Sequence, residues 1–148
     1  MTEEQVTKAI LSELIDNGWT IVAYDFPQSG TGKLLHPNDI TDEKNKGGII
    51  PDIIAVRGGT CLFFENKDRV VLADFKKIES LRRDNRYRAA IEALLADFDI
   101  NGIYYGIGIP SHKFNAQAKA ASPTVDFIVG VISVGKSEFL YNPNNLTL

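Results

Sequence analysis

A pair of adjacent glycines constrains the fold of this 148-residue chain more than any other feature. Gly58 and Gly59 separate two apolar runs, residues 49–57 and 60–67, which are rich in β-branched and aromatic side chains. Two glycines between such runs are a strong hairpin signal, because the favoured two-residue turn needs positive φ at both positions. The sequence therefore predicts two antiparallel strands joined by this glycine pair.

The register of that hairpin places charged side chains together. With the glycine pair as the loop, Arg57 faces Thr60 and, further along, Asp52 faces Glu65, with Cβ atoms about 4.5 to 5.5 Å apart. The side-chain period of two puts Lys67 on the same face as Glu65. Two carboxylates and an amine are thus expected to converge.

The convergence indicates a cation site. Directly opposed like charges destabilise a strand pair, and buried charges cost more unless something neutralises them. Mg²⁺ suits such a place, because it binds through one or two protein carboxylates and keeps several waters. The alternative is that Asp52 only begins a strand after Pro51, while Glu65 and Lys67 lie on a solvent face. The apolar residues around them disfavour it, since isolated charges are rare in a core.

The rest of the chain predicts one domain, residues 1–148, of the α/β (α+β) class. The length and the 44% hydrophobic content suit a single core. A Thr2–Gln5 capping box and an apolar stripe predict a first helix that ends near Asn17. The other expected elements are strands at residues 19–26, 103–109 and 125–134, an edge strand within 138–148, a helical tract after residue 73 to about 98 with a break near 82–85, and a helix at 113–121. This order predicts a central mixed sheet flanked by helices.

Residues 27–48 are predicted to form a long loop, and loops of this length are usually functional or mobile. Within it, residues 29–33 look like part of a phosphate-binding loop. That interpretation is rejected, because the full pattern needs glycine in place of Pro27 and serine or threonine in place of Leu34. His36 is more typical of a surface residue than of a metal ligand.

Charge limits the classes of partner. The 16 basic and 19 acidic residues give a net charge of −3, which argues weakly against a general nucleic-acid binder. One stretch is nevertheless locally basic, and it is either a nucleic-acid-binding face or a solvated helix face. Its basic residues are Lys76, Lys77, Arg82, Arg83, Arg86 and Arg88.

No apolar run is long enough to span a bilayer, and the acidic start of the chain lacks the pattern of a secretory signal. A cytoplasmic protein with no membrane partner is therefore expected. Cys61 has no second cysteine to pair with and is interpreted as a core residue. No glycine-rich nucleotide turn or nucleophile elbow indicates a small-molecule enzyme.

The residues of the hairpin resemble a known signature. Ile50-Pro51-Asp52-Ile53-Ile54, followed across the turn by Phe64-Glu65-Asn66-Lys67, resembles the motif of the PD-(D/E)XK, restriction-endonuclease-like nucleases. The predicted order of elements also resembles the αβββαβ core of that family. Asn66 departs from the pattern, since many members carry an apolar residue there.

This resemblance implies roles for individual residues. Asp52, Glu65 and the backbone carbonyl of Asn66 would bind Mg²⁺, for which Mn²⁺ is expected to substitute. Lys67 would position or deprotonate the attacking water. Some relatives add a carboxylate from the first helix; Glu13, on the flank of the apolar stripe, is either that ligand or an ordinary boundary residue.

The implied function is a Mg²⁺-dependent endonuclease that hydrolyses the phosphodiester bonds of DNA, as a compact restriction enzyme or a junction-resolving nuclease. A homodimer is expected, because cutting a duplex requires two active sites and cyclic dimers are the commonest oligomers. One alternative is an RNA-cleaving, toxin-type nuclease of the same fold. Another is a fold relative that binds nucleic acid or protein without chemistry, which the presence of all three motif residues disfavours.

Overall fold

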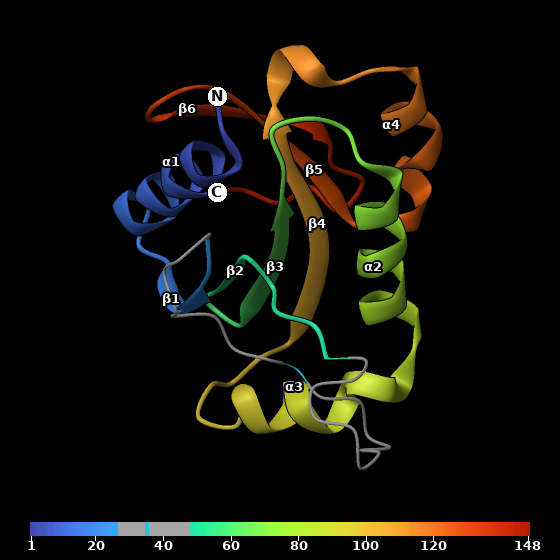
Figure 1. Ribbon diagram of the computed structural model, residues 1–148. Coiled ribbons are helices and arrows are strands. Elements are labelled where there is room, and N and C mark those ends of the chain that lie inside the picture. The colour runs from blue at the N-terminus through green and yellow to red at the C-terminus, as the bar shows by residue number, and fades with distance from the viewer. Residues whose placement is uncertain (27–34, 36–47) are drawn as a thin grey trace.

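The computed structural model describes residues 1–26, 35 and 48–148, and in this part of the chain six strands form one mixed sheet (Figure 1). The strands lie side by side in chain order. Neighbours are antiparallel from β1 to β3, parallel from β3 to β5 and antiparallel between β5 and β6. Their bounds are β1 Thr20–Tyr24, β2 Ile53–Arg57, β3 Thr60–Asn66, β4 Gly102–Pro110, β5 Phe127–Ser133 and β6 Lys136–Tyr141.

Helices cover both faces of the sheet, as predicted. Helix α1 packs on one face, whereas α2 and α4 lie along the other (Figure 1). The capping box of Thr2 and Gln5 at the start of α1 is confirmed. The predicted break in the long tract is also confirmed, because α2 ends at Arg83 and the backbone of Asp84 is extended. The helices are α1 Glu3–Asp16, α2 Leu72–Arg83, α3 Arg88–Leu94 and α4 Ala116–Ala121, with 3₁₀ turns at Asn85–Tyr87, Ser111–Lys113 and Ser122–Thr124.

The glycine-turn hairpin forms in the predicted register. Gly58 and Gly59 have φ of 54° and 85°, the left-handed values that favour glycine at both turn positions. Arg57 faces Thr60, and the ladder continues to the start of β2. Side chains alternate along β2 and β3, so that each strand feeds one apolar core beneath α1 and a second beneath α2.

The remaining elements follow the prediction with shifted ends. The strand expected within residues 138–148 is β6, which begins at Lys136 and occupies an edge of the sheet. The expected helix at 113–121 is a 3₁₀ turn followed by the shorter α4. Cys61 is fully buried in the core. Among the described residues, no helix has both the length and the apolarity needed to cross a membrane.

Part of the predicted long loop is not described, since residues 27–34 and 36–47 fall outside the described ranges. The rejected phosphate-loop segment, residues 29–33, and His36 lie there. At the edge of this region, the backbone of Leu35 bridges to Ile49.

Candidate active site

Two buried carboxylates lie at the open end of the hairpin, away from its glycine turn. Asp52 directly precedes β2, and Glu65 is near the end of β3. Only 7% of Asp52 and 4% of Glu65 is exposed. Asp52 lies two residues before Ile54 and Glu65 two residues after Phe63, so each carboxylate follows the side-chain alternation of that apolar residue. Ile54 and Phe63 belong to the core beneath α2. The two carboxylates therefore share one face of the sheet, as the sequence predicted.

Burial and mutual repulsion disfavour the charged form of this pair. Burial raises the pKa of Asp52 to about 8, and the Glu65 charge adds to that rise. The backbone N–H of Asn66, which donates to Asp52 Oδ2 at 2.6 Å, works in the opposite direction. Burial also raises the pKa of Glu65, although an ion pair with Lys77 opposes it. Without a cation, the pair is an electrostatic cost to the fold.

Lys67, the first residue after β3, lies near the two carboxylates. Its backbone N–H donates to the carbonyl of Gly108 at 2.9 Å, which holds the chain against β4. Its Nζ lies 3.3 and 3.4 Å from the two carboxylate oxygens of Glu3 in the first turn of α1. Burial lowers the pKa of Lys67, but Asp74, Glu3 and Glu65 together outweigh that effect and raise it. Lys67 is therefore held as an ammonium ion.

Helix α2 contributes two further charged groups. Lys77 Nζ lies 2.9 Å from Glu65 Oε2. Asp74, one helical turn earlier, is buried, and its Oδ2 has no hydrogen-bond partner among the described residues. Burial raises the pKa of Asp74, and the charges of Lys67 and Lys77 oppose that rise. We call the full set the charged cluster: Glu3, Asp52, Glu65, Lys67, Asp74 and Lys77.

Sequence reasoning does not find three members of this cluster. In the sequence, Glu3 is part of a helix start, Asp74 belongs to no motif, and Lys77 stands within the predicted nucleic-acid-binding face. A signal exists for the α2 pair, since Asp74 and Lys77 are three residues apart and share one face of a helix. The sequence alone does not show that this face of the helix lies against the hairpin.

Glu13, which the sequence leaves as either a metal ligand or an ordinary boundary residue, does not join the cluster, and its position favours the boundary residue. Its carboxylate accepts a hydrogen bond from the hydroxyl of Ser137 on β6. Glu3, not Glu13, is the α1 carboxylate that contacts a cluster residue, Lys67. The physical reason is axial distance, because a rise of about 1.5 Å per residue separates the two glutamates by about 15 Å along the helix.

The side chain of Asn66 lies on the opposite face of the sheet, where one of its two polar atoms finds a partner. Its side chain is fully buried, and its Nδ2 donates to the hydroxyl of Thr7 on α1 at 3.1 Å. Gly108 lies directly against it, since an added Cβ there would overlap Asn66 Oδ1. The amide nitrogen of Asn66 thus has a partner on α1, whereas its buried Oδ1 has none among the described residues. The backbone N–H of Asn66 faces the carboxylate of Asp52.

The basic residues of the predicted stretch have different surroundings in the structure. Arg82 pairs with buried Asp126, Nε to Oδ1 at 2.9 Å, and also donates to the carbonyl of Pro123, so it fastens α2 to the turn before β5. The other basic residues outside the cluster are exposed. Arg83 and Arg88 pair with Glu79 and Glu92 at 3.7 and 3.4 Å, Arg86 lies over the ring of Tyr87, and Lys76 faces solvent.

The donor set fits Mg²⁺ in kind. Among the described residues, no group of three or more His, Cys, Asp or Glu side chains is placed to hold a metal ion. Mg²⁺ does not need three, because one or two carboxylates, waters and substrate oxygens complete its shell. The buried Asp52–Glu65 pair provides such carboxylates.

No protein-family model and no curated protein matches the chain. The site is therefore interpreted from its own geometry.

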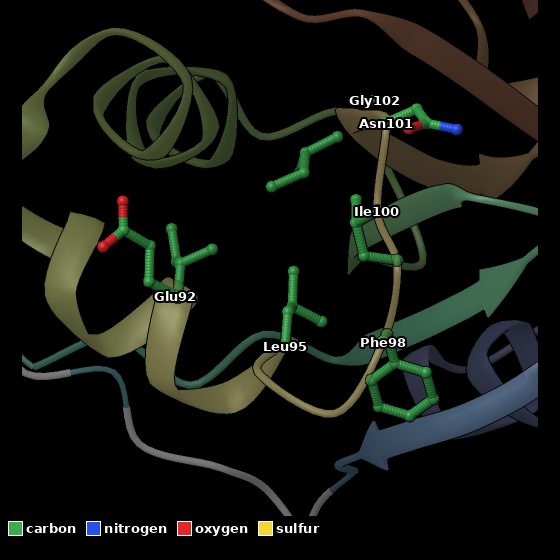
Figure 2. Close-up of a pocket in the computed structure, with 8 residues that line it drawn as sticks. Glu92, Leu95, Phe98, Ile100, Asn101 and Gly102 are labelled. Atoms are coloured by element: carbon green, nitrogen blue, oxygen red, sulfur yellow. The ribbon is translucent and has the colours of Figure 1, made fainter.

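A pocket of about 320 Å³ offers a different candidate, between α3 and the start of β4, where Leu95 and Ile100 contribute apolar side chains (Figure 2). It lies at the other end of the strands, since Gly102 in its lining pairs with the first residue of β3. The charged cluster is not part of it.

Proposed function

We propose that the protein is a Mg²⁺-dependent endonuclease of the PD-(D/E)XK type, which hydrolyses phosphodiester bonds of DNA at the charged cluster. The observation that carries this proposal is the burial of Asp52 and Glu65 on one face, with two lysines beside them. Neutral residues would pack the hairpin without that cost. A divalent cation would relieve the repulsion between the two carboxylates, and binding such a cation would explain why the pair is buried.

The roles follow from the donor chemistry. Asp52, Glu65 and the backbone carbonyl of Asn66 would hold the ion, with Glu3 as the α1 carboxylate of the cluster. When bound, Mg²⁺ supplies Lewis-acid activation of the phosphate and a water of lowered pKa. The raised pKa of Lys67 supports an ammonium that orients the water or stabilises negative charge, in preference to a base that removes its proton.

Nucleic-acid binding would use the exposed part of the basic stretch. Lys76, Arg83, Arg86 and Arg88 carry charge on the surface of α2, α3 and the 3₁₀ turn between them, and phosphate contacts of this kind position a duplex without reading its sequence. Arg82 is excluded from this set by its pairing with Asp126. A homodimer is part of the proposal for duplex cleavage, and sedimentation with and without substrate measures it. A monomer in both conditions would indicate a nicking or single-strand enzyme.

A substrate panel tests the proposal. Supercoiled, linear, branched and single-stranded DNA, together with RNA, are incubated with the protein in Mg²⁺, Mn²⁺ or chelator, and Asp52→Asn is run alongside. Cleavage of DNA in either metal, abolished in chelator and in the variant, is the expected result. Cleavage of RNA alone would favour the toxin-type nuclease. Binding in chelator with no cleavage of any substrate would favour a non-catalytic relative.

A further inference from the structure

The charged cluster contains two lysines, and the one closer to the buried pair is not the one in the signature. Lys77 Nζ is 2.9 Å from Glu65 Oε2, whereas Lys67 Nζ pairs with the oxygens of Glu3, at 3.3 and 3.4 Å. The charge of Lys77 acts on Asp52 as well, where it opposes the rise in pKa. In the metal-free protein, Lys77 is thus the counter-cation of the carboxylate pair.

Lys77 is also placed to leave that position. Its side chain is 31% exposed, whereas that of Glu65 is 5% exposed, so the ammonium reaches in from the surface of α2. A lysine side chain is a flexible stem with a compact charge. An ion held by Glu65 would repel Lys77, whose ammonium group could then pair with a phosphate of the bound substrate.

Helix α2 also carries a buried carboxylate, Asp74, near Lys77. It lies three residues before Lys77, on the same face of α2, and its buried Oδ2 is unpartnered among the described residues. Its charge acts on both Lys67 and Lys77. Asp74 therefore adds a negative charge near the two ammonium groups of the cluster.

Resting on the nuclease function proposed above, we propose that Lys77 is a second catalytic lysine. In the absence of metal it neutralises Glu65. When the ion occupies the carboxylates, Lys77 exchanges Glu65 for a substrate phosphate and stabilises its negative charge. Nothing in the signature assigns this role to a residue of α2.

Metal affinity tests the exchange without using activity. Binding of Mg²⁺ alone is measured by calorimetry for the parent, Lys77→Met, Lys77→Arg and the control Lys119→Met, which removes the same charge from an exposed position on α4. Because Lys77 competes with the ion for Glu65, Lys77→Met is expected to bind Mg²⁺ about threefold more tightly or better. The parent, Lys77→Arg and Lys119→Met should agree with one another. Unchanged or weaker binding by Lys77→Met would overturn the exchange.

Substrate affinity tests the interaction with phosphate. Binding of a DNA duplex is measured against salt concentration in Ca²⁺ and in chelator. Removing one lysine–phosphate interaction lowers the log–log slope by about 0.9, so Lys77→Met should show that drop in Ca²⁺ and the parent slope in chelator. The same slope as the parent in both conditions, or the same drop in both, would overturn this interaction. A parent protein that binds no nucleic acid would instead remove the nuclease function itself, while tighter Mg²⁺ binding by Lys77→Met would still show that Lys77 competes with the ion for Glu65.

Discussion

The two ends of the β3–β4 strand pair differ in what they bury. At the start of the strands, near Thr60 and Gly102, there is a pocket of about 320 Å³ with a largely apolar lining. At the far end, near Glu65 and Ile107, the chain buries charged side chains whose pKa values are shifted. The first end is therefore distinguished by a cavity, and the second by the electrostatic cost of burying charged groups. Shifted pKa values gather at functional sites, so the cost is the better guide to function here.

Alanine substitutions give the largest expected contrast between the two ends. Asp52→Ala, Glu65→Ala and Lys67→Ala should each lower turnover by at least about a hundredfold, because each removes a positioned catalytic or electrostatic group. Leu95→Ala, in the pocket, should keep turnover within about twofold and lower the free energy of unfolding by about 2 to 4 kcal/mol. Steady-state kinetics and denaturant unfolding measure both. Near-normal cleavage by Lys67→Ala would remove the main support for the active-site assignment.

The two ends of α1 give a smaller contrast. Glu3→Gln should lower turnover about tenfold, or about 1.4 kcal/mol in activation free energy, because Lys67 loses its ion-pair partner. Glu13→Gln is the matched control on the same helix and should retain parent turnover. Kinetics of the two variants decide between the glutamates, and the reverse order would restore Glu13 as the helix ligand.

The basic stretch should separate into binding and structural arginines. Replacing Arg83 and Arg86 by alanine should weaken DNA binding and reduce the log–log salt slope by about 0.9 for each arginine that neutralises a phosphate in the parent complex. Arg82→Ala should instead lower the free energy of unfolding, since it leaves buried Asp126 without its ion pair. Salt titrations and denaturant melts measure the two effects. An unchanged slope for the double variant would make this stretch a solvated helix face.

The pH dependence of stability should report the carboxylate pair. The folded-state pKa of Asp52, about 8, lies above its ordinary value of 3.8, so the folded protein holds a proton that the unfolded chain has released between these values. In chelator, the parent should therefore lose stability relative to Asp52→Asn as pH rises from about 5 to about 8. Melts across this range measure the difference, and a parent that gains stability relative to the variant would contradict the assigned shift.

The hairpin and its carboxylate pair could be predicted because a local signal fixes both. Once Gly58 and Gly59 form the turn, the register follows, and Asp52 must approach Glu65. The helices, the break after Arg83 and the mixed sheet likewise follow from periodicity and caps. The composition of the charged cluster outside the hairpin could not be predicted in this way.

Those missing residues depend on how helices dock. The apolar stripe of α1 shows which face is buried but not which end of the helix meets the site, and this is why the sequence leaves the role of Glu13 open and does not identify Glu3. Lys77 stands in a run of basic residues that is typical of a surface. Its approach to Glu65 arises only when Phe75 and Ile78 bury the adjoining face of α2 in the core.

Thermal melts of the parent and Asp52→Asn test the central claim most directly, since they need no knowledge of the substrate. Asparagine can still accept the N–H of Asn66, so neutralising Asp52 removes repulsion at little structural cost. In chelator, Asp52→Asn should be as stable as the parent or more stable by at least some tenths of a kcal/mol. In Mg²⁺ the order should reverse, because the parent gains binding free energy that the variant largely lacks. A variant clearly less stable than the parent in chelator would show that Asp52 is a structural residue and not half of a cation site.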